Sequence, residues 1–376
     1  MQLRGFLPAR RGAVVIASVA LGAAASGCGM AVGGSGVGSA NLGGLTHPRI
    51  LTRIVSMSAQ HTGLITDGTA PVVVHLTGPR AAGSPRPRIE PSIPGSWSDQ
   101  GNAEVFTPDG TIPPCRWYAL VVPARTRAKG QAPLPHGRSQ AIHVPCPSTT
   151  GLQRTLARLG YLPYTLHSPG ATTASSSPAS LRDAAKQAFA PPSAGRLRAR
   201  FSNAPVLATG QMDQVTTGAL MAFQADHNLN PDGSAGATTW AKLLEAGASG
   251  SRSSKPYTWV TVSKEGTETL QVHRNGHVVL SSPANTGVSG AETPSGAFPI
   301  FERFTSTTMT GTNPDGSQYS DPGVPWVNYF TGGDAVHGFD RGSYGSPQSN
   351  GCVELPPAMA AKVYPLLTIG TLVVVS

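Results

Sequence analysis

The chain has 376 residues, and its 28 Lys and Arg against 19 Asp and Glu give a net charge of +9. Its 45 glycines and 34 prolines make up about a fifth of the chain, whereas charged residues are 12% and hydrophobic residues 39%. This composition is too apolar for a disordered chain and too poor in charge for a coiled coil. Short elements between many Gly and Pro turns favour a mainly β architecture with some helix.

The positive charge is spread along the chain. Only the segment 196–200, Arg-Leu-Arg-Ala-Arg, gathers three arginines, and no aromatic residues alternate with them. Nucleic-acid surfaces usually combine basic and aromatic side chains, so we expect no nucleic-acid partner. A diffuse positive charge is compatible with attraction to a polyanionic wall or membrane surface, or simply with a composition that prefers Arg.

The N-terminus has the pattern of an export signal. Arginines at positions 4, 10 and 11 precede the apolar stretch 13–25, which is too short to cross a bilayer and ends in Ser26-Gly27-Cys28. A Cys directly after small residues resembles the lipobox of bacterial lipoproteins, although Ala25 stands where that motif usually has Leu. The resemblance implies a signal peptide over 1–27 and lipidation of Cys28. The alternative is an ordinary signal peptide with Cys28 incidental.

The remaining three cysteines divide into a pair and a single thiol. Cys115 and Cys146 lie at the ends of β-like runs, and an exported chain can oxidise them to a disulfide. Cys352 is then left over. An odd Cys in an exported protein is a candidate reactive thiol, and the alternative is a buried, inert side chain.

Two regions follow the signal peptide. Residues 28–49 are rich in Gly and small residues, which is typical of a flexible tether. Residues 50–146 are β-rich, with strands expected at 72–76 and 117–122 and turn residues between the runs. We expect a β-rich domain here, organised as a small sandwich.

Residues 147–246 carry a helical pattern instead. Leu152, Leu156 and Leu159 fall on one helical face, and further helices are expected at 216–224, with a Thr cap, and at 238–244. These segments resemble the small three-helix peptidoglycan-binding domain, interrupted by a Ser-, Ala- and Pro-rich insertion at about 168–206. The alternative is a helical spacer that does not bind the wall.

A linker at 247–255 separates this region from a second β-rich stretch. The dipeptide Asn275-Gly276 between alternating runs is a strong hairpin signal, and the flanking His273 and His277 are interpreted as strand-end residues. The chain closes with a short helix near 358–364 and a last strand at 371–375.

The chemistry is concentrated near Cys352. A thiol needs a base to become a nucleophile, and His337 is the only His after residue 277. Gly351 would allow a carbonyl oxygen to approach the backbone, so the N–H groups of Gly351 and Cys352 are candidate oxyanion donors. A metal site formed by His337, Asp340 and Cys352 would lack the usual ligand spacing and a fourth ligand. We expect neither a metal nor a cofactor.

Five motifs in this region resemble the YkuD-type catalytic domain of L,D-transpeptidases. They occur in the family's order over about 256–376: Thr293-Pro294-Ser295-Gly296, Gly323-Val324-Pro325-Trp326, His337-Gly338, Ser349-x-Gly351-Cys352-Val353, and Gly370-Thr371-Leu372-Val373-Val374. The resemblance implies acyl transfer on peptidoglycan stem peptides through a Cys thioester. It implies catalytic roles for Cys352, His337 and Gly338, and oxyanion or substrate contacts by Gly351, Asn350, Ser349, Tyr329 and Trp326. A carbonyl of Gly338 or its neighbours would orient the His337 ring, with Asp340 as the alternative.

Two positions depart from the family motif. Asn350 stands where His is usual, and Glu354 stands where Arg or Asn is common. Asn350 can still form hydrogen bonds but carries no charge. A carboxylate near the thiol would raise its pKa, unless Glu354 points to a cationic partner.

The sequence therefore predicts a multidomain, mainly β protein with a small α module in the middle and a YkuD-type catalytic domain at the C-terminus. It predicts an exported, lipid-anchored L,D-transpeptidase at the outer face of the cytoplasmic membrane, acting as a monomer in the cell wall. The alternatives are an L,D-carboxypeptidase, which sends the acyl group to water, and a non-catalytic wall-binding lipoprotein with a degenerate transpeptidase domain.

Overall fold

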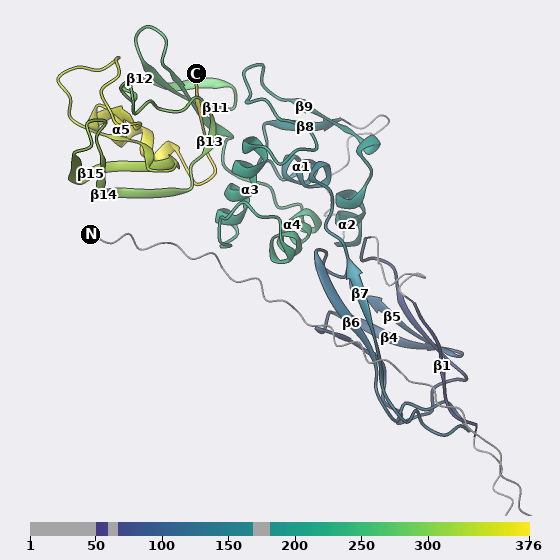
Figure 1. Cartoon of the computed structure of the whole chain (residues 1–376). Helices are drawn as coiled ribbons and strands as arrows, with labels where there is room; N and C mark the ends of the chain where they lie inside the picture. Colours follow the sequence, from purple (N-terminus) through teal and green to yellow (C-terminus); the bar gives the residue numbers. More distant parts are fainter. Residues whose placement is uncertain (1–49, 59–66, 168–180) are drawn as a thin grey trace, which may run out of the picture. The chain divides into compact units, whose positions relative to one another are not determined.

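The computed structural model describes residues 50–58, 67–167 and 181–376 (Figure 1). The expected signal peptide, the lipidation site Cys28 and the tether lie outside the described residues, as does the first part of the expected insertion. None of the described helices is long and apolar enough to cross a membrane.

The described part of the N-terminal region is entirely β, as its composition predicts. Its strands are β1 (Ile54–Ser58), β2 (Val72–Leu76), β3 (Arg88–Glu90), β4 (Gly95–Gln100), β5 (Ala103–Pro108), β6 (Arg116–Val122) and β7 (Arg138–Val144). They form a four-stranded sheet in the order β1-β2-β5-β4 and a three-stranded sheet in the order β3-β6-β7.

The two N-terminal sheets share one hydrophobic core, which is the sandwich that the sequence predicts. Val72, Val74 and Phe106 come from the first sheet, and Leu120 and Ile142 from the second, and all five are buried. Alternate residues of a strand point to opposite faces. One face of each sheet therefore builds this core, and the other face is available to solvent.

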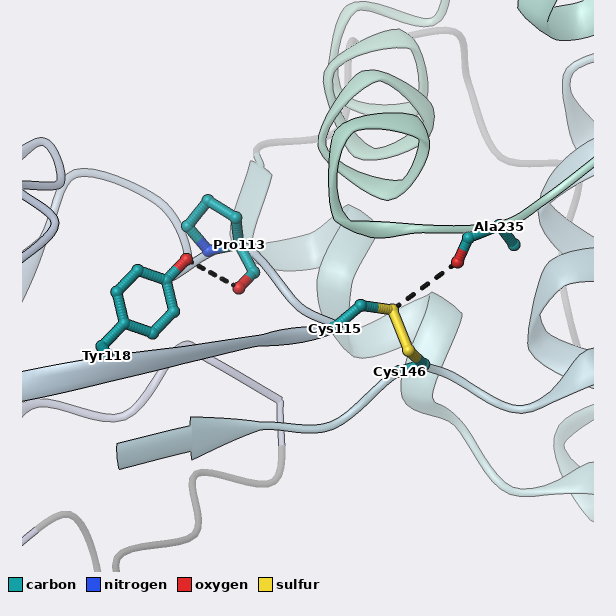
Figure 2. Close-up of a disulfide and its surroundings, with 5 residues drawn as sticks. All are labelled: Pro113, Cys115, Tyr118, Cys146 and Ala235. Atoms are coloured by element: carbon teal, nitrogen blue, oxygen red, sulfur yellow. Dashed lines mark hydrogen bonds between the residues drawn. A yellow bond between two sulfur atoms is a disulfide. The ribbon is translucent and has the colours of Figure 1, made fainter. Parts of the chain in front are cut away.

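Cys115 and Cys146, which flank β6 and β7, are joined by a disulfide in the structure (Figure 2). The hydroxyl of Tyr118 donates a hydrogen bond of 3.0 Å to the carbonyl oxygen of Pro113 nearby. The Cys115 sulfur also lies 3.7 Å from the carbonyl oxygen of Ala235, which belongs to the helical region. The disulfide thus closes the end of the sandwich that lies next to the helices.

The middle region contains helices and a two-stranded antiparallel sheet. Its elements are α1 (Thr149–Arg158), β8 (Tyr164–His167), α2 (Leu181–Phe189), a 3-10 turn (Pro192–Ala194), β9 (Arg196–Ala199), α3 (Gln214–Asp226) and α4 (Ala237–Ser249). The leucines expected on one helical face lie in or next to α1, and all three are buried in the helical core.

The described part of the expected insertion contains α2, which buries three alanines in the helical core. Two local expectations for this region were wrong. The cap of α3 is Asp213, whose carboxylate accepts from the backbone N–H of Thr216, so the helix starts earlier than the predicted Thr cap. Finally, α4 continues to Ser249, so the first three residues of the expected linker are helical.

The C-terminal region consists of two sheets around a second core. The strands are β10 (Thr258–Ser263), β11 (Thr269–Arg274), β12 (His277–Pro283), β13 (Gly296–Pro299), β14 (Glu302–Thr312), β15 (Gln318–Thr331), β16 (Asp334–Gly338), β17 (Val353–Leu355) and β18 (Leu372–Val375). A helix, α5 (Pro357–Val363), and a 3-10 turn (Tyr364–Leu366) precede β18. The sheet orders are β12-β11-β10-β18-β13 and β14-β15-β16-β17.

Helix α3 packs directly against the C-terminal region. A Cβ placed on Gly218 of α3 would lie 2.6 Å from the carbonyl oxygen of Gly370, so only glycine allows this approach. Trp259 and Leu372, from β10 and β18, are buried in the same core as the helices. The helical region and the C-terminal sheets therefore share buried surface.

Candidate active site

The site is built on the parallel pair β16 and β17. Val336 pairs with Val353, and His337 pairs with Glu354. Cys352 directly precedes β17, two residues before Glu354. Paired residues on neighbouring strands, and alternate residues along one strand, share a face of the sheet. This register therefore brings His337, Cys352 and Glu354 to one face, although 15 positions separate the His and the Cys in the sequence.

His337 and Cys352 line the same cavity. Other lining side chains come from the β14–β15 hairpin and from the loop that links β16 to β17. They are Met309, Tyr319, Asp321, Val324, Phe339, Arg341, Ser349, Asn350 and Glu354. The sequence predicted the His and the Cys at this place, together with Ser349 and Asn350.

The imidazole of His337 is held by its own strand. The side chain is buried, and its Nδ1 lies 3.0 Å from the carbonyl oxygen of Gly338. A carbonyl oxygen can only accept, so the proton is assigned to Nδ1 and the lone pair to Nε2. Burial lowers the pKa of His337 below its ordinary value of 6.5, so the ring is neutral at pH 7. The structure thus contains the backbone contact expected at Gly338, whereas Asp340 is exposed.

Cys352 is a protonated thiol in the resting site. Its residue is 7% exposed, and burial raises the pKa of the thiol to about 12. A hydrogen bond from the backbone of Ala335 lowers the pKa, while the charges of Asp334 and Glu354 raise it. No described hydrogen bond joins the Cys352 sulfur to the His337 ring. Proton transfer between them therefore requires a closer approach than the resting geometry provides.

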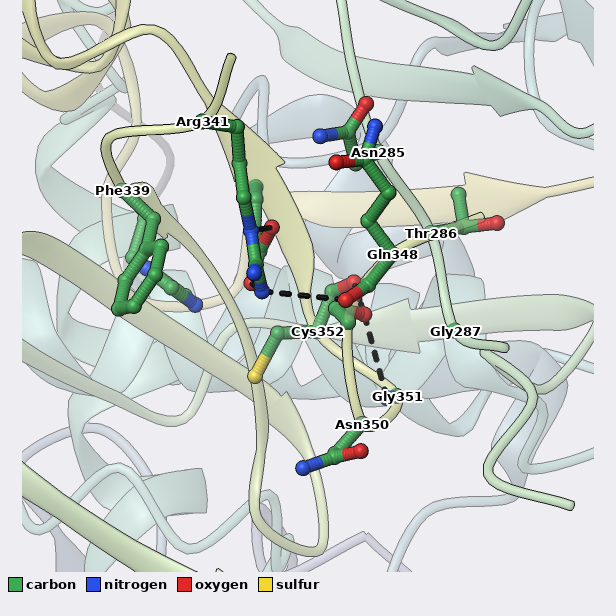
Figure 3. A network of polar contacts seen from close by, with 12 residues as sticks. Asn285, Thr286, Gly287, Phe339, Arg341, Gln348, Asn350, Gly351 and Cys352 are labelled. Carbon is green, nitrogen blue, oxygen red and sulfur yellow. Dashed lines mark hydrogen bonds and ion pairs between the residues drawn. The ribbon is translucent and has the colours of Figure 1, made fainter. Parts of the chain in front are cut away.

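Arg341 is the cationic partner of Glu354 (Figure 3). Its Nε and Nη2 atoms donate to the two carboxylate oxygens at 2.8 and 2.7 Å, and the Glu354 side chain is 5% exposed. Nη2 also donates to the carbonyl oxygen of Gln348 at 3.0 Å, and the guanidinium lies 4.7 Å from the ring centre of Phe339. The departure from the family motif at position 354 is therefore matched by a bidentate ion pair, which partly offsets the effect of the carboxylate charge on the thiol.

The loop before Cys352 is fixed by hydroxyl groups. Ser349 Oγ donates to the carbonyl oxygen of Cys352 at 2.6 Å and accepts from the Gly351 N–H at 3.2 Å. Thr293 Oγ1 donates to the carbonyl oxygen of Gly351 at 2.8 Å. The Gly351 N–H, expected as an oxyanion donor, is thus occupied in the resting structure.

Gly351 itself cannot be replaced without strain. Its φ is +109°, and a Cβ there would lie 2.3 Å from a carboxylate oxygen of Asp334. The carboxyl group of Asp334 therefore lies directly against the loop that carries Cys352. Burial raises the pKa of Asp334 to about 6. Nothing in the sequence motif singled out this residue.

Asn350 contacts the hairpin that supplies part of the cavity wall. Its Nδ2 donates to Oδ1 of Asn313 at 2.6 Å, and Asn313 lies in the turn between β14 and β15. In Figure 3 its side chain extends away from the Arg341 network. The residue that replaces the family's usual His thus forms a contact between the Cys loop and the hairpin turn.

Two aromatic residues expected at the substrate do not line the cavity. Trp326 packs on Tyr364, with ring centres 5.4 Å apart, and Tyr329 packs between Phe301 and Phe304. Tyr319, on the same strand β15, lines the cavity instead. Tyr329 nevertheless packs against the apolar cluster that contains Cys352, so its expected contact with the substrate stays a prediction. The register of β15 against β14 shifts at an irregularity near Met309, and motif spacing alone could not predict that Tyr319 lines the cavity.

Sequence reasoning also missed Asp321, Phe339 and Arg341. For Arg341 a signal existed, because an unusual Glu two residues after the Cys calls for a nearby cation, and Arg341 follows His337 by four residues. Among the residues that the structure describes, no group of three His, Cys, Asp or Glu side chains could hold a metal ion.

Comparison with known families identifies two parts of the chain. Residues 257–375 match the family model of the L,D-transpeptidase catalytic domain, and residues 196–243 match that of a putative peptidoglycan binding domain. The second match covers β9, α3 and the first half of α4, but not α1. No curated protein matches the chain.

Several solved structures are similar to the chain. The catalytic domain of an Enterococcus faecium L,D-transpeptidase is 26% identical, with 33% of this chain and 100% of that chain covered and a TM-score of 0.30. An L,D-transpeptidase from Mycobacterium smegmatis is 13% identical, with 86% and 99% covered and a TM-score of 0.29. L,D-transpeptidase 3 from Mycobacterium tuberculosis is 12% identical, with 86% and 98% covered and a TM-score of 0.30.

Proposed function

We propose that the chain, whose residues 257–375 match the family model of the L,D-transpeptidase catalytic domain, is an exported enzyme that transfers an acyl group from a peptidoglycan tetrapeptide stem through a thioester on Cys352. The observation that supports the roles most directly is the contact between His337 Nδ1 and the carbonyl oxygen of Gly338. It leaves Nε2 as a free base in the cavity that also contains the thiol.

The resting pair is a neutral thiol and a neutral imidazole. When a stem peptide enters, the Cys352 sulfur attacks the carbonyl carbon before the terminal D-Ala, and its proton passes to His337 Nε2. The protonated ring then gives that proton to the departing D-Ala amine, which leaves the acyl group on sulfur as a thioester. An amine of a second stem then attacks the thioester carbon and loses a proton to His337. The C–S bond breaks, and His337 returns the proton to the Cys352 sulfur, which restores the thiol.

The loop before Cys352 would stabilise the negative oxygen of each tetrahedral intermediate. The N–H groups of Gly351 and Cys352 are the proposed donors, and losing one such donor typically costs about 2.7–4 kcal/mol. For Gly351 this requires its hydrogen bond to Ser349 Oγ to be exchanged for one to the substrate. Gly351, Ser349 and Asn350 remain the proposed contacts of the substrate.

The decisive experiment uses the soluble chain and a purified tetrapeptide stem, analysed by mass spectrometry. Wild type should form stem dimers and a mass adduct with a carbapenem. Cys352→Ala should form neither, and His337→Ala should acylate slowly at most. An adduct that persists in Cys352→Ala, or none in folded wild type, would refute Cys352 as the nucleophile. Tripeptide without dimers would identify an L,D-carboxypeptidase instead.

The remaining parts of the proposal concern location and binding. The chain would be anchored to the outer face of the cytoplasmic membrane through a lipid on Cys28, and its region around 196–243 would bind the wall polymer. Cys28→Ala should then release the protein from the membrane fraction. Unchanged fractionation of this variant would contradict the lipid anchor.

A further inference from the structure

One aromatic side chain on the N-terminal sandwich has no structural role in a core. All five tryptophans lie among the described residues, and Trp240 and Trp259 are buried while Trp97 and Trp326 are partly buried. Trp117 alone is exposed, at 64%. Its exposed indole offers a flat apolar face together with an N–H donor.

The sheet β3-β6-β7 presents Trp117 on its outer face. Burial alternates along β6, where Tyr118 and Leu120 face the core. Trp117 pairs across the sheet with His143 of β7, and Ala119 pairs with Ala141. The next pair on this face, Ala119 and Ala141, is therefore small, and the indole stays exposed.

The indole is also held in position. Its ring stacks on the imidazole of His143, with ring centres 4.3 Å apart and planes 19° from parallel. A braced ring loses little side-chain entropy when it binds a ligand. Further along the same face, Arg88 and Glu90 of β3 form an exposed ion pair of 2.6 Å, and Glu90 pairs with Ala119.

We propose that this face, defined by Trp117, His143, Arg88 and Glu90, is a binding platform for the glycan strand of peptidoglycan. A pyranose ring presents a flat face of C–H groups edged by hydroxyl and amide groups. The indole face can stack on the C–H groups of the sugar. The ion pair and the imidazole can form hydrogen bonds with its hydroxyl and amide groups. The inference rests on the proposed function for the identity of the polymer, but not on the Cys352 chemistry.

The side chains of this face favour a sugar polymer over other classes of ligand. A nucleic acid or anionic lipid would require unpaired cations, whereas Arg88 is paired with Glu90. A dry protein interface would require a continuous apolar patch, whereas Trp117 is surrounded by alanines, Ser139 and charged side chains. An isolated stacking ring with polar flanks suits a hydrated sugar polymer.

The test uses the full soluble chain and a hexamer of β-1,4-linked N-acetylglucosamine. The hexamer should shield wild-type tryptophan fluorescence from acrylamide, because Trp117 is the exposed indole. Trp117→Ala should weaken hexamer binding, measured by calorimetry, about five- to tenfold, and Trp117→Phe should retain part of it. His143→Ala should weaken binding less, by freeing the ring.

Controls separate this proposal from the other functions of the chain. Val55→Ala removes another exposed apolar side chain of the same region and should leave binding unchanged. Each variant should keep its carbapenem adduct on Cys352, so failure of the platform and failure of the proposed chemistry are distinguishable. The proposal would be overturned if wild type did not bind the hexamer, or if Trp117→Ala bound it equally well. It would also be overturned if wild type formed a concentration-dependent dimer that only Trp117→Ala lost.

Discussion

Arg341 and Glu354 form an ion pair in the cavity that also holds the thiol of Cys352. The carboxylate is buried and shares a face with Cys352, and the guanidinium binds both of its oxygens. Burial is the main cause of the raised pKa of the thiol, and the Glu354 charge adds to it. Because the Arg341 cation lies against the carboxylate, it opposes part of this effect of Glu354 on the thiol.

Removing the Arg341 cation should destabilise the fold and raise the pKa of the Cys352 thiol. In Arg341→Ala the Glu354 carboxylate would be buried without a partner, which should cost about 3 kcal/mol in the free energy of unfolding. The thiol pKa should rise further, so alkylation of Cys352 by iodoacetamide should shift to higher pH. The double variant Arg341→Ala/Glu354→Gln should recover much of both effects. If the single variant alkylates like wild type, the carboxylate does not influence the thiol.

Asp334 should make stability depend on pH in the opposite sense to a salt-bridged acid. Burial raises its pKa from 3.8 to about 6 in the folded chain. Between these values the folded state binds the proton more tightly than the unfolded state, so stability falls as pH rises from about 4 to about 6. Because the side chain is only half-buried, solvent screening reduces the loss to about 1–2 kcal/mol.

The variant Asp334→Asn removes the titrating charge. We expect a higher melting temperature than wild type at pH 7.5 and nearly the same melting temperature at pH 4, measured by calorimetry. Asp340→Asn, at an exposed position on the same side of the loop, is the control and should change neither value. An equal shift of Asp334→Asn at both pH values would contradict the assignment of the effect to its ionisation.

Among the elements, the hairpin β14–β15 and the loop before β17 enclose the cavity together. Asn313 at the hairpin turn and Asn350 in the loop contribute one side-chain hydrogen bond between them. Such a bond is worth about 0.5–1.5 kcal/mol when both partners are neutral. Because this bond joins the hairpin turn to the Cys352 loop, it should influence how far the turn opens.

Asn350→Ala and Asn313→Ala should therefore raise KM for the stem peptide by a similar factor of about two- to fivefold. The double variant should be no worse than either single one, because both remove the same contact. Hydrogen exchange of residues 311–318 should accelerate in all three. Asn350→His, toward the family motif, should change activity modestly, and its complete loss would mean that the pocket is built differently from the family's.

Across the chain as a whole, the disulfide joins the ends of two strands beside the helical region. It closes a loop of 31 residues, which should be worth about 3–4 kcal/mol in the chain-entropy account. Cys115→Ser/Cys146→Ser should lower the melting temperature of the sandwich and leave carbapenem acylation of Cys352 intact. Peptide mapping without reductant should recover the linked pair. Free thiols at both positions in protein from an oxidising compartment would contradict the bond.

The sequence by itself determined the features that depend on local pattern. The hairpin at Asn275-Gly276, the strand Val72–Leu76 and the buried face of α1 each follow from spacing and residue type. The same holds for the Cys352 and His337 pair, because a thiol and a single nearby His are recognisable in any fold. The pairing of Cys115 with Cys146 was predicted instead from the cysteine count and the expected export. Local preferences sufficed where neighbours in sequence make the contact.

The tertiary structure alone decided which distant side chains complete the site. Arg341 reaches Glu354 because β16 and β17 pair in one register, and Tyr319 lines the cavity on a long hairpin whose register contains an irregularity. A shift of one residue in a strand reverses the face of every side chain, and no sequence spacing records such a shift. Helix α2 lies within the segment 168–206, whose overall composition did not reveal it. Its own residues are mostly good helix formers, and its alanines are buried in the helical core, so propensity and packing act together there.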